Sequence, residues 1–112
     1  MPNKINVQTK GARAELLACA HYLEIGWQVF RSVSPSCQCD LIVLDEEANA
    51  FKVEVRTLTV NRSSKNHLQY GRGNVENYDI IALVNPNDGR VFTFDANEEK
   101  SIIFNSIRAS YG

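Results

Sequence analysis

Residues 36–57, SCQCDLIVLDEEANAFKVEVRT, decide the fold of this chain. The uninterrupted apolar run at residues 41–44 predicts a short strand that is buried on both faces. Residues 45–49 are polar and predict a turn, and the strict alternation of residues 51–57 predicts a second strand. We therefore expect a β-hairpin at the centre of the fold.

Charged residues occupy unusual positions in this hairpin. Because successive side chains of a strand point to opposite faces, Lys52, Glu54 and Arg56 share one face of the second strand. Asp40 precedes the first strand, and antiparallel pairing would bring it close to Glu54. Two adjacent carboxylates repel, so either a cation lies between them or one keeps its proton, and Mg²⁺ suits such oxygen ligands. The alternative is an ordinary half-buried strand with a solvent face, in which Asp40 has no function.

The composition indicates one globular domain. The chain has 112 residues, 44% of them hydrophobic, so we expect residues 1–112 to form a single domain with a substantial core. Twelve basic and thirteen acidic residues nearly cancel, so the overall charge does not indicate a nucleic-acid partner. No apolar run approaches the roughly 20 residues of a membrane span, and no secretory signal is visible. We therefore expect a cytoplasmic protein without a membrane contact.

The three cysteines are expected to be free thiols. An odd number of cysteines in a cytoplasmic chain argues against a disulfide framework. Cys37 and Cys39 are separated by one residue, which is not the spacing of a zinc knuckle, so zinc is the less favoured alternative. Cys19 is expected to be a small hydrophobic residue on a helix.

A helix is predicted from residue 9 or 10 to about residue 25, and Gly26 is suited to end it. Glu15 borders its apolar face, and the residues three and four positions away include no base with which it could pair. An acid near a helix N-terminus also compensates the helix dipole, so both a structural and a functional role of Glu15 stay open. The expected apolar stripe consists of Leu16, Cys19, Ala20, Leu23 and Trp27.

Three further strands are predicted. Residues 27–31 alternate, and residues 78–84 form a second buried apolar run. Residues 85–89 end in Asp-Gly and predict a tight turn, after which residues 90–94 alternate and pair back as a hairpin.

The end of the chain is ambiguous. Asp95 and Glu98 have the spacing of a helix capping box. The segment that follows fits either a helix or an edge strand, and both stay open. We expect the core to span about residues 10–95 and residues 96–112 to form a C-terminal tail.

A locally basic segment lies between Val55 and Val75. It contains four basic residues, an aromatic residue and no acid, a composition that suits a phosphate backbone. A short helical turn is expected over residues 63–70, and the alternative to nucleic-acid binding is a solvated loop. The candidate nucleic-acid-binding residues are Lys10, Arg62, Lys65, Tyr70 and Arg72.

Together these elements predict an α/β domain: a mixed sheet of about five strands with the N-terminal helix packed on one face. Asp40 and Glu54 would lie on adjacent strands, and Glu15 at the edge of the helix face that packs on them. The three carboxylates could therefore converge at one site.

In the order and spacing of these elements, the chain resembles the PD-(D/E)XK nuclease superfamily, and most closely its Holliday-junction-resolvase-like and small homing-endonuclease-like members. The resemblance covers about residues 10–95 in order and spacing. It is carried by GARAE at 11–15, GW at 26–27, CDLIV at 39–43, VEVRT at 53–57, YDIIALV at 78–84 and RVFTF at 90–94.

This resemblance implies a restriction-endonuclease-like fold and a DNA endonuclease that depends on Mg²⁺ or Mn²⁺. It implies that Asp40 and Glu54 bind the metal, that Glu15 assists, and that Arg56 occupies the position of the family's lysine. The implied catalytic residues are therefore Glu15, Asp40, Glu54 and Arg56.

The sequence departs from the family pattern at two positions. Cys39 replaces a proline that does no chemistry. Arg56 replaces the lysine, and because arginine stays protonated it cannot act as a base, although it can stabilise developing negative charge. Lys52 or Lys65 could supply an amine instead. The alternative function is a catalytically impaired nucleic-acid-binding or assembly module on the same fold.

A homodimer or higher oligomer is expected, because one such domain offers one active site and a duplex has two strands. Two-fold pairing would also match a symmetric DNA site. The apolar tail, with Ile102, Ile103, Phe104 and Ile107, is expected to form the contact.

Overall fold

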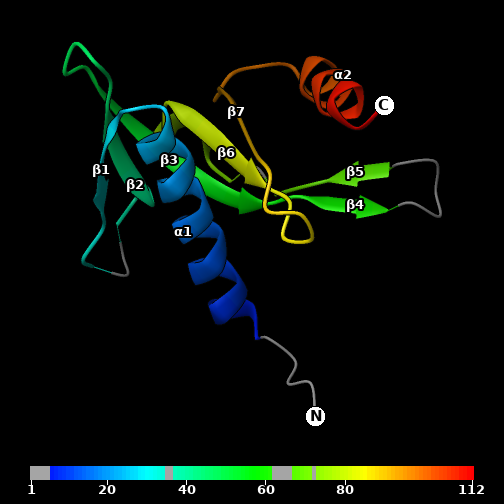
Figure 1. Cartoon of the computed structure of the whole chain (residues 1–112), viewed down its shortest axis with the longest axis horizontal. Coiled ribbons are helices and arrows are strands. Elements are labelled where there is room, and N and C mark those ends of the chain that lie inside the picture. Colours follow the sequence, from blue (N-terminus) through cyan, green and yellow to red (C-terminus); the bar gives the residue numbers. More distant parts are fainter. Residues whose placement is uncertain (1–5, 35–36, 62–66, 72) are drawn as a thin grey trace.

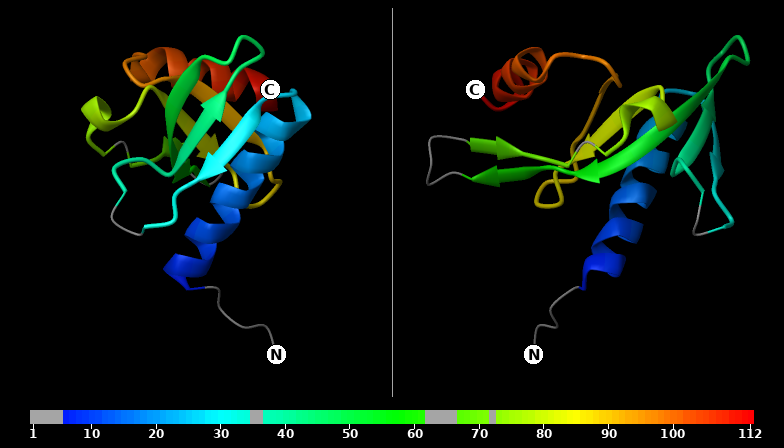
Figure 2. Two further views of the ribbon diagram at one scale, coloured as in Figure 1. Left: turned by 90° about the vertical axis from the view of Figure 1, so that its left-hand side faces the viewer. Right: turned by 180° about the vertical axis from the view of Figure 1, so that it is seen from behind.

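A five-stranded mixed sheet forms the centre of the protein, in the order β1-β2-β3-β6-β7 (Figure 1). The computed structural model describes residues 6–34, 37–61, 67–71 and 73–112. Helices α1 and α2 cover opposite faces of the sheet (Figures 1 and 2). The expected α/β fold with an N-terminal helix on a five-stranded mixed sheet is therefore confirmed. The elements of this core are α1 (Val7–Glu24), β1 (Gln28–Arg31), β2 (Leu41–Leu44), β3 (Ala50–Thr57), β6 (Ile80–Val84), β7 (Val91–Asp95) and α2 (Lys100–Tyr111).

The two predicted hairpins are both present. Strands β2 and β3 pair antiparallel, with Leu41 opposite Val53, and the Asp45 side chain closes their turn by accepting hydrogen bonds from the backbone N–H groups of Glu47 and Asn49. Strand β3 then pairs in parallel with β6, and β6 pairs antiparallel with β7. The parallel pair places Glu54 and Arg56 of β3 in the middle of the sheet, where they are partly shielded from water, whereas Lys52 is exposed.

Helix α1 begins at Val7, two or three residues before the predicted start. The Asn6 side chain caps it by accepting a hydrogen bond from Thr9 N at 2.8 Å, which stabilises the extra turn. The helix ends at Glu24, followed by Gly26 at a φ of 89°, as the sequence predicts.

The buried face of α1 differs from the predicted stripe. Leu16 and Leu23 are 55% and 60% exposed, and Ala20 is also exposed. Alanine and leucine occur around the whole helix, so periodicity alone does not select one face. The small side chains face the sheet, which lets the helix backbone approach it closely. The buried residues are Ala14, Ala18, Cys19 and Tyr22, of which only Cys19 was in the predicted stripe, while Trp27 packs partly buried against them.

The C-terminal tail is a helix that belongs to the core. Ile103 and Ile107 are fully buried on the face of the sheet opposite α1, so the prediction that the apolar tail forms a dimer contact is wrong for these two residues. Only Ile102 among the tail isoleucines is substantially exposed, at 49%. The predicted capping box is also wrong: Glu98 N donates to Asp95 O in a turn, and the helix begins later, at Lys100.

A two-stranded ribbon, β4 (Thr59–Asn61) and β5 (His67–Gln69), projects beyond the sheet (Figure 1). The predicted helical turn over 63–70 is therefore wrong at residues 67–69, and residues 63–66 lie outside the described part of the chain. Leu58 and Leu68 are buried beneath α2, and this tertiary burial overrides the local preference. A 3₁₀ turn at Val75–Asn77 leads back to β6.

In the part of the chain that the structure describes, neither helix has the length and apolar character needed to cross a membrane.

Candidate active site

The Asp40 carboxyl group is held against β3 at the start of β2. Asp40 N donates to Val53 O at 3.1 Å, and Asp40 Oδ2 accepts a hydrogen bond from Val55 N at 2.8 Å. These bonds flank Glu54, and the Asp40 carboxyl group lies close enough to Glu54 to raise its pKa. The predicted proximity of the two acids is confirmed. We call Asp40 and Glu54 the carboxylate pair.

The surroundings of Glu54 disfavour its charged form. Burial, followed by the hydrogen bond and negative charge of Asp40, raises the pKa of Glu54 from 4.5 to about 7, and the neighbouring Arg56 opposes this rise. Two close carboxylates repel, so the uncharged form of Glu54 is favoured as long as no cation lies between the two acids.

Glu15 approaches the carboxylate pair from α1. Burial raises the pKa of Glu15, the negative charge of Asp40 raises it further, and Arg31 lowers it. Glu15 Oε1 lies 3.9 Å from Arg31 Nη2, a partner on β1 that no helical spacing could predict. Glu15 and Asp40 line one open pocket of about 350 Å³ together with Ser32, Val33, Ser34, Cys37 and Cys39.

Arg56 completes the group of implied catalytic residues. Its Nη2 atom lies 3.2 Å from Glu54 Oε2, and the Glu54 side chain is only 13% exposed. Lys52 is exposed, and its backbone N–H donates to Asp79 Oδ2, while Lys65 lies outside the described residues. Among the described residues, Arg56 is therefore the basic side chain that contacts the carboxylate pair through Glu54.

The donor set suits a hard cation. No group of three or more His, Cys, Asp and Glu side chains is arranged to hold a metal ion within the described residues. Mg²⁺ is commonly held by one or two carboxylates, with water and substrate phosphate supplying the other ligands, so two carboxylates are a suitable protein contribution. All three cysteines are free, as expected, and Cys19 is buried in the core.

The candidate nucleic-acid-binding residues are only partly described. Lys10 is exposed on the first turns of α1, whereas Arg62, Lys65 and Arg72 lie outside the described residues. The Tyr70 ring packs edge-on against Phe104, with 5.8 Å between ring centroids, and the Lys100 ammonium lies 5.6 Å from its centre. This packing occupies part of the ring surface that base stacking would use. Binding of nucleic acid by these residues stays a prediction.

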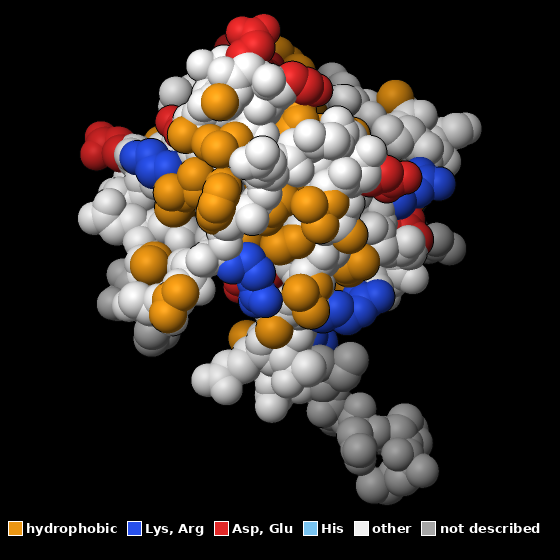
Figure 3. All heavy atoms as spheres, turned by 60° about the vertical axis from the view of Figure 1, so that its left-hand side comes forward, with side chains coloured by type: hydrophobic (Ala, Val, Ile, Leu, Met, Phe, Trp, Pro, Cys, Tyr) orange, Lys and Arg blue, Asp and Glu red, His pale blue; other side chains and the backbone are white. Residues whose placement is uncertain are grey.

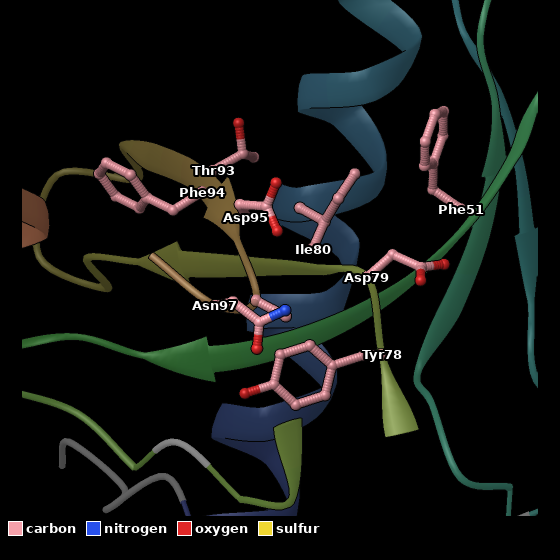
Figure 4. A pocket seen from close by; sticks show the side chains of 9 residues that line it. Phe51, Tyr78, Asp79, Ile80, Thr93, Phe94, Asp95 and Asn97 are labelled. Atoms are coloured by element: carbon pink, nitrogen blue, oxygen red, sulfur yellow. The ribbon is translucent and has the colours of Figure 1, made fainter. Parts of the chain in front are cut away.

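A second open pocket, of about 510 Å³, contains none of the implied catalytic residues (Figure 4). Its Asp79 and Asp95 side chains lie apart and do not converge in this view, and Asp79 accepts a hydrogen bond from Lys52 N at 2.9 Å. Asp79 thus stabilises the backbone. The pocket is lined by Phe51, Tyr78, Asp79, Ile80, Thr93, Phe94, Asp95, Ala96 and Asn97.

Two contacts at the site were not expected from the sequence. Arg31 pairs with Glu15, and the loop containing Gly73 lies against the Arg56 guanidinium. The alternation of residues 27–31 places Arg31 on a strand but does not identify its partner. The two glycines at 71 and 73 mark a loop, and only the folded chain shows what that loop covers.

Comparisons with known proteins show the fold. No protein-family model and no curated protein matches the chain. Among solved structures, the chain is similar to a bacterial homing endonuclease, I-Ssp6803I, with a TM-score of 0.66 and 17% sequence identity. The match covers 83% of this chain and 71% of that chain. The protein therefore shares a nuclease-like fold with this endonuclease.

Proposed function

We propose that the protein is a PD-(D/E)XK-type DNA endonuclease that depends on Mg²⁺ or Mn²⁺. The observation that carries the proposal is the proximity of Asp40, directly before β2, to Glu54 on the adjacent strand β3. The shared fold with a bacterial homing endonuclease supports it. Fold alone does not decide function, so the argument depends on these residues.

Asp40 and Glu54 would hold the metal ion. Val55 N orients the Asp40 carboxylate, and Glu54 would give up its proton when a cation is bound. The bound ion would supply an activated water and neutralise charge on the scissile phosphate. Glu15 adds a further carboxylate on the side of the Asp40 pocket.

Arg56 would act as a fixed positive charge. Because its guanidinium stays protonated, it cannot remove a proton from water, but it can stabilise negative charge that develops on the phosphoryl group. Its side chain is 39% exposed, so a substrate could reach part of it. Lys52 or Lys65 would have to supply any amine that the reaction needs.

Duplex DNA is the proposed partner. The ribbon β4–β5 follows β3 after one intervening residue, so it extends directly from the strand that holds Glu54 and Arg56. Thr59 and Gln69 are register partners on this ribbon and both are exposed, whereas Leu68 is buried. A two-stranded ribbon fits the major groove of B-DNA, where glutamine and threonine can contact base edges. The proposed phosphate and base contacts remain Lys10, Arg62, Lys65, Tyr70 and Arg72.

The second candidate function is a nucleic-acid-binding or assembly module without catalysis. The observation in its favour is that an arginine, paired with Glu54 at 3.2 Å, stands where the resembled family has a lysine. Both candidates use the same surface, and metal-dependent cleavage separates them.

We also propose a homodimer or higher oligomer. Hydrophobic side chains gather in several clusters over this face of the molecule, with basic side chains between them (Figure 3). Phe30 and Ile42 are register partners on β1 and β2, and they are 52% and 40% exposed. Because the tail isoleucines Ile103 and Ile107 are buried within the chain, this exposed pair is the better candidate for self-association.

The decisive experiment is cleavage of supercoiled plasmid with Mg²⁺ or Mn²⁺, with EDTA as the blank. Wild type should nick or linearise the plasmid, and Asp40→Asn and Glu54→Ala should be inactive. Glu24→Gln, which changes an exposed acid at the end of α1, is the matched control and should cleave like wild type. Metal-independent cleavage, or equal cleavage by Asp40→Asn, would overturn the proposal. Metal-dependent DNA binding without cleavage would select the second candidate.

A further inference from the structure

Gly71 and Gly73, after β5, lie against the Arg56 side chain. A methyl group on Gly71 would lie 3.7 Å from Arg56 Nη1, which is an ordinary contact. A methyl group on Gly73 would lie 2.6 Å from Arg56 Nη2, closer than real contacts allow, and 3.5 Å from Glu54 Oε2. Gly73 therefore leaves the space that the end of the guanidinium occupies.

Gly73 also has a backbone that favours glycine. Its φ is +64°, in the left-handed region that glycine and, less readily, asparagine adopt. Two separate physical reasons therefore place a glycine at this position. An asparagine would satisfy the backbone requirement but would still bring a Cβ atom against Arg56.

Among the described residues, the guanidinium has one ion pair. Nη2 pairs with Glu54 Oε2 at 3.2 Å, and Nε is buried without an acceptor in that part of the chain. An arginine side chain has several rotatable bonds, so its position depends on the packing around it as well as on this pair. The close approach of the Gly73 backbone restricts the movement of the guanidinium.

We propose that Gly73 is a positioning residue, which holds the Arg56 guanidinium beside Glu54 by allowing the loop backbone to close over it. This inference deepens the proposed function and rests on it only for the consequence in catalysis. It further explains how the site accommodates arginine: a guanidinium is broad and planar, whereas a lysine ammonium is compact and would not require the same space.

The test compares wild type with Gly73→Asn, Arg56→Lys and the double variant, with Gly71→Ala as the control. The first readout is solvent exchange of the Arg56 Nε–H in metal-free protein, assigned by NMR from its loss in Arg56→Lys. Buried, protected N–H groups exchange only when the local structure opens. Gly73→Asn should speed this exchange about tenfold or more, and Gly71→Ala should change it little.

The second readout is the plasmid cleavage rate. Gly73→Asn should lower the rate in the arginine background, and in the lysine background the same substitution should have a much smaller effect. Unchanged Nε–H exchange in Gly73→Asn, or equal effects of that substitution in both backgrounds, would overturn the inference. If no variant cleaves DNA, the proposed function fails, while the exchange measurement still decides whether Gly73 positions Arg56.

Discussion

Asp40, directly before β2, lies beside Glu54 on β3, held there by a 2.8 Å hydrogen bond from Val55 N to its carboxylate; burial and then the neighbouring Asp40 raise the pKa of Glu54 to about 7. The uncharged form of Glu54 is favoured because ionising two close carboxylates costs electrostatic free energy. A divalent cation would replace the proton.

Metal binding should release a proton and depend on Asp40. Below about pH 7, the affinity of wild type for Mn²⁺ should rise by about tenfold per pH unit, because Glu54 must lose a proton to bind metal. Calorimetric titration in buffers of different ionisation enthalpy measures both affinity and proton release. Asp40→Asn should lose most of the affinity. Equal affinity in the two proteins, or no binding by either, contradicts a joint site.

The stability of the metal-free protein should depend on Glu54 in the same pH range. Because the folded-state pKa of Glu54 is raised from 4.5 to about 7, its contribution to stability is fully present below pH 4.5 and is lost as the pH rises through 7. Glu54→Gln cannot ionise, so its stability relative to wild type should increase by about 1–3 kcal/mol between pH 4.5 and pH 8.

Urea unfolding in EDTA at several pH values measures this difference. Glu47→Gln, which removes an exposed carboxylate of the β2–β3 turn, is the control. A constant difference between Glu54→Gln and wild type across the pH range would show that the two carboxyl groups do not share a proton.

Arg56 should contribute to catalysis only through its charge. Arg56→Ala should lose about 2.7–4 kcal/mol of transition-state stabilisation, the usual loss on removing one electrostatic stabiliser. Arg56→Lys should keep or raise the plasmid cleavage rate. If wild type is inactive and Arg56→Lys restores Mg²⁺-dependent cleavage, the protein is a binding module. If Arg56→Ala cleaves as fast as wild type, Lys52 or Lys65 becomes the candidate.

Helix α2 should contribute strongly to stability. Ile107 is fully buried, so Ile107→Ala should lower the free energy of unfolding by about 2–5 kcal/mol. Ile102 lies on the same helix and is 49% exposed, so Ile102→Ala is the matched control, with an expected change within about 0.5 kcal/mol. Similar effects of the two substitutions on urea unfolding would contradict the packing of α2 against the sheet.

Self-association should depend on the β1–β2 face. Light scattering at micromolar concentration should give the mass of a dimer or higher oligomer for wild type. Phe30→Asp should shift the mass toward the monomer, whereas Ile102→Asp on α2 should leave it unchanged, because Phe30 belongs to the exposed Phe30–Ile42 pair. A monomeric wild type, with and without DNA, counts against self-association, and the opposite pattern of the two variants assigns the contact to α2.

Much of the central sheet follows from local sequence. The polar turn at Asp45 and the alternation of residues 51–57 are enough to set the register of β2 and β3, because a shift of one residue would expose every buried side chain of β3. The same register brings Asp40 beside Glu54. The carboxylate pair was therefore predictable from residues that are close in sequence and joined by one tight turn.

The packing of the helices was decided by the tertiary structure. Apolar residues surround α1, so its sequence permits several buried faces, and only contact with the sheet selects Ala14, Ala18 and Tyr22 over Leu16 and Leu23. The segment of Ile103 and Ile107 fits a helix or a strand by sequence. It is a helix that covers the second face of the sheet, where its isoleucines lose their contact with water.

By itself, the sequence determined the first helix, the five strands of the central sheet in their order along the chain, the two hairpins and the adjacency of Asp40 and Glu54. It could do so because strand alternation and turn residues act over short distances along the chain. Only the tertiary structure decided that Arg31 pairs with Glu15 and that Gly73 lies against Arg56. Those partners lie on separate elements, and no local preference encodes their contact. It forms when burial of the apolar faces fixes the helix and the loop against one sheet.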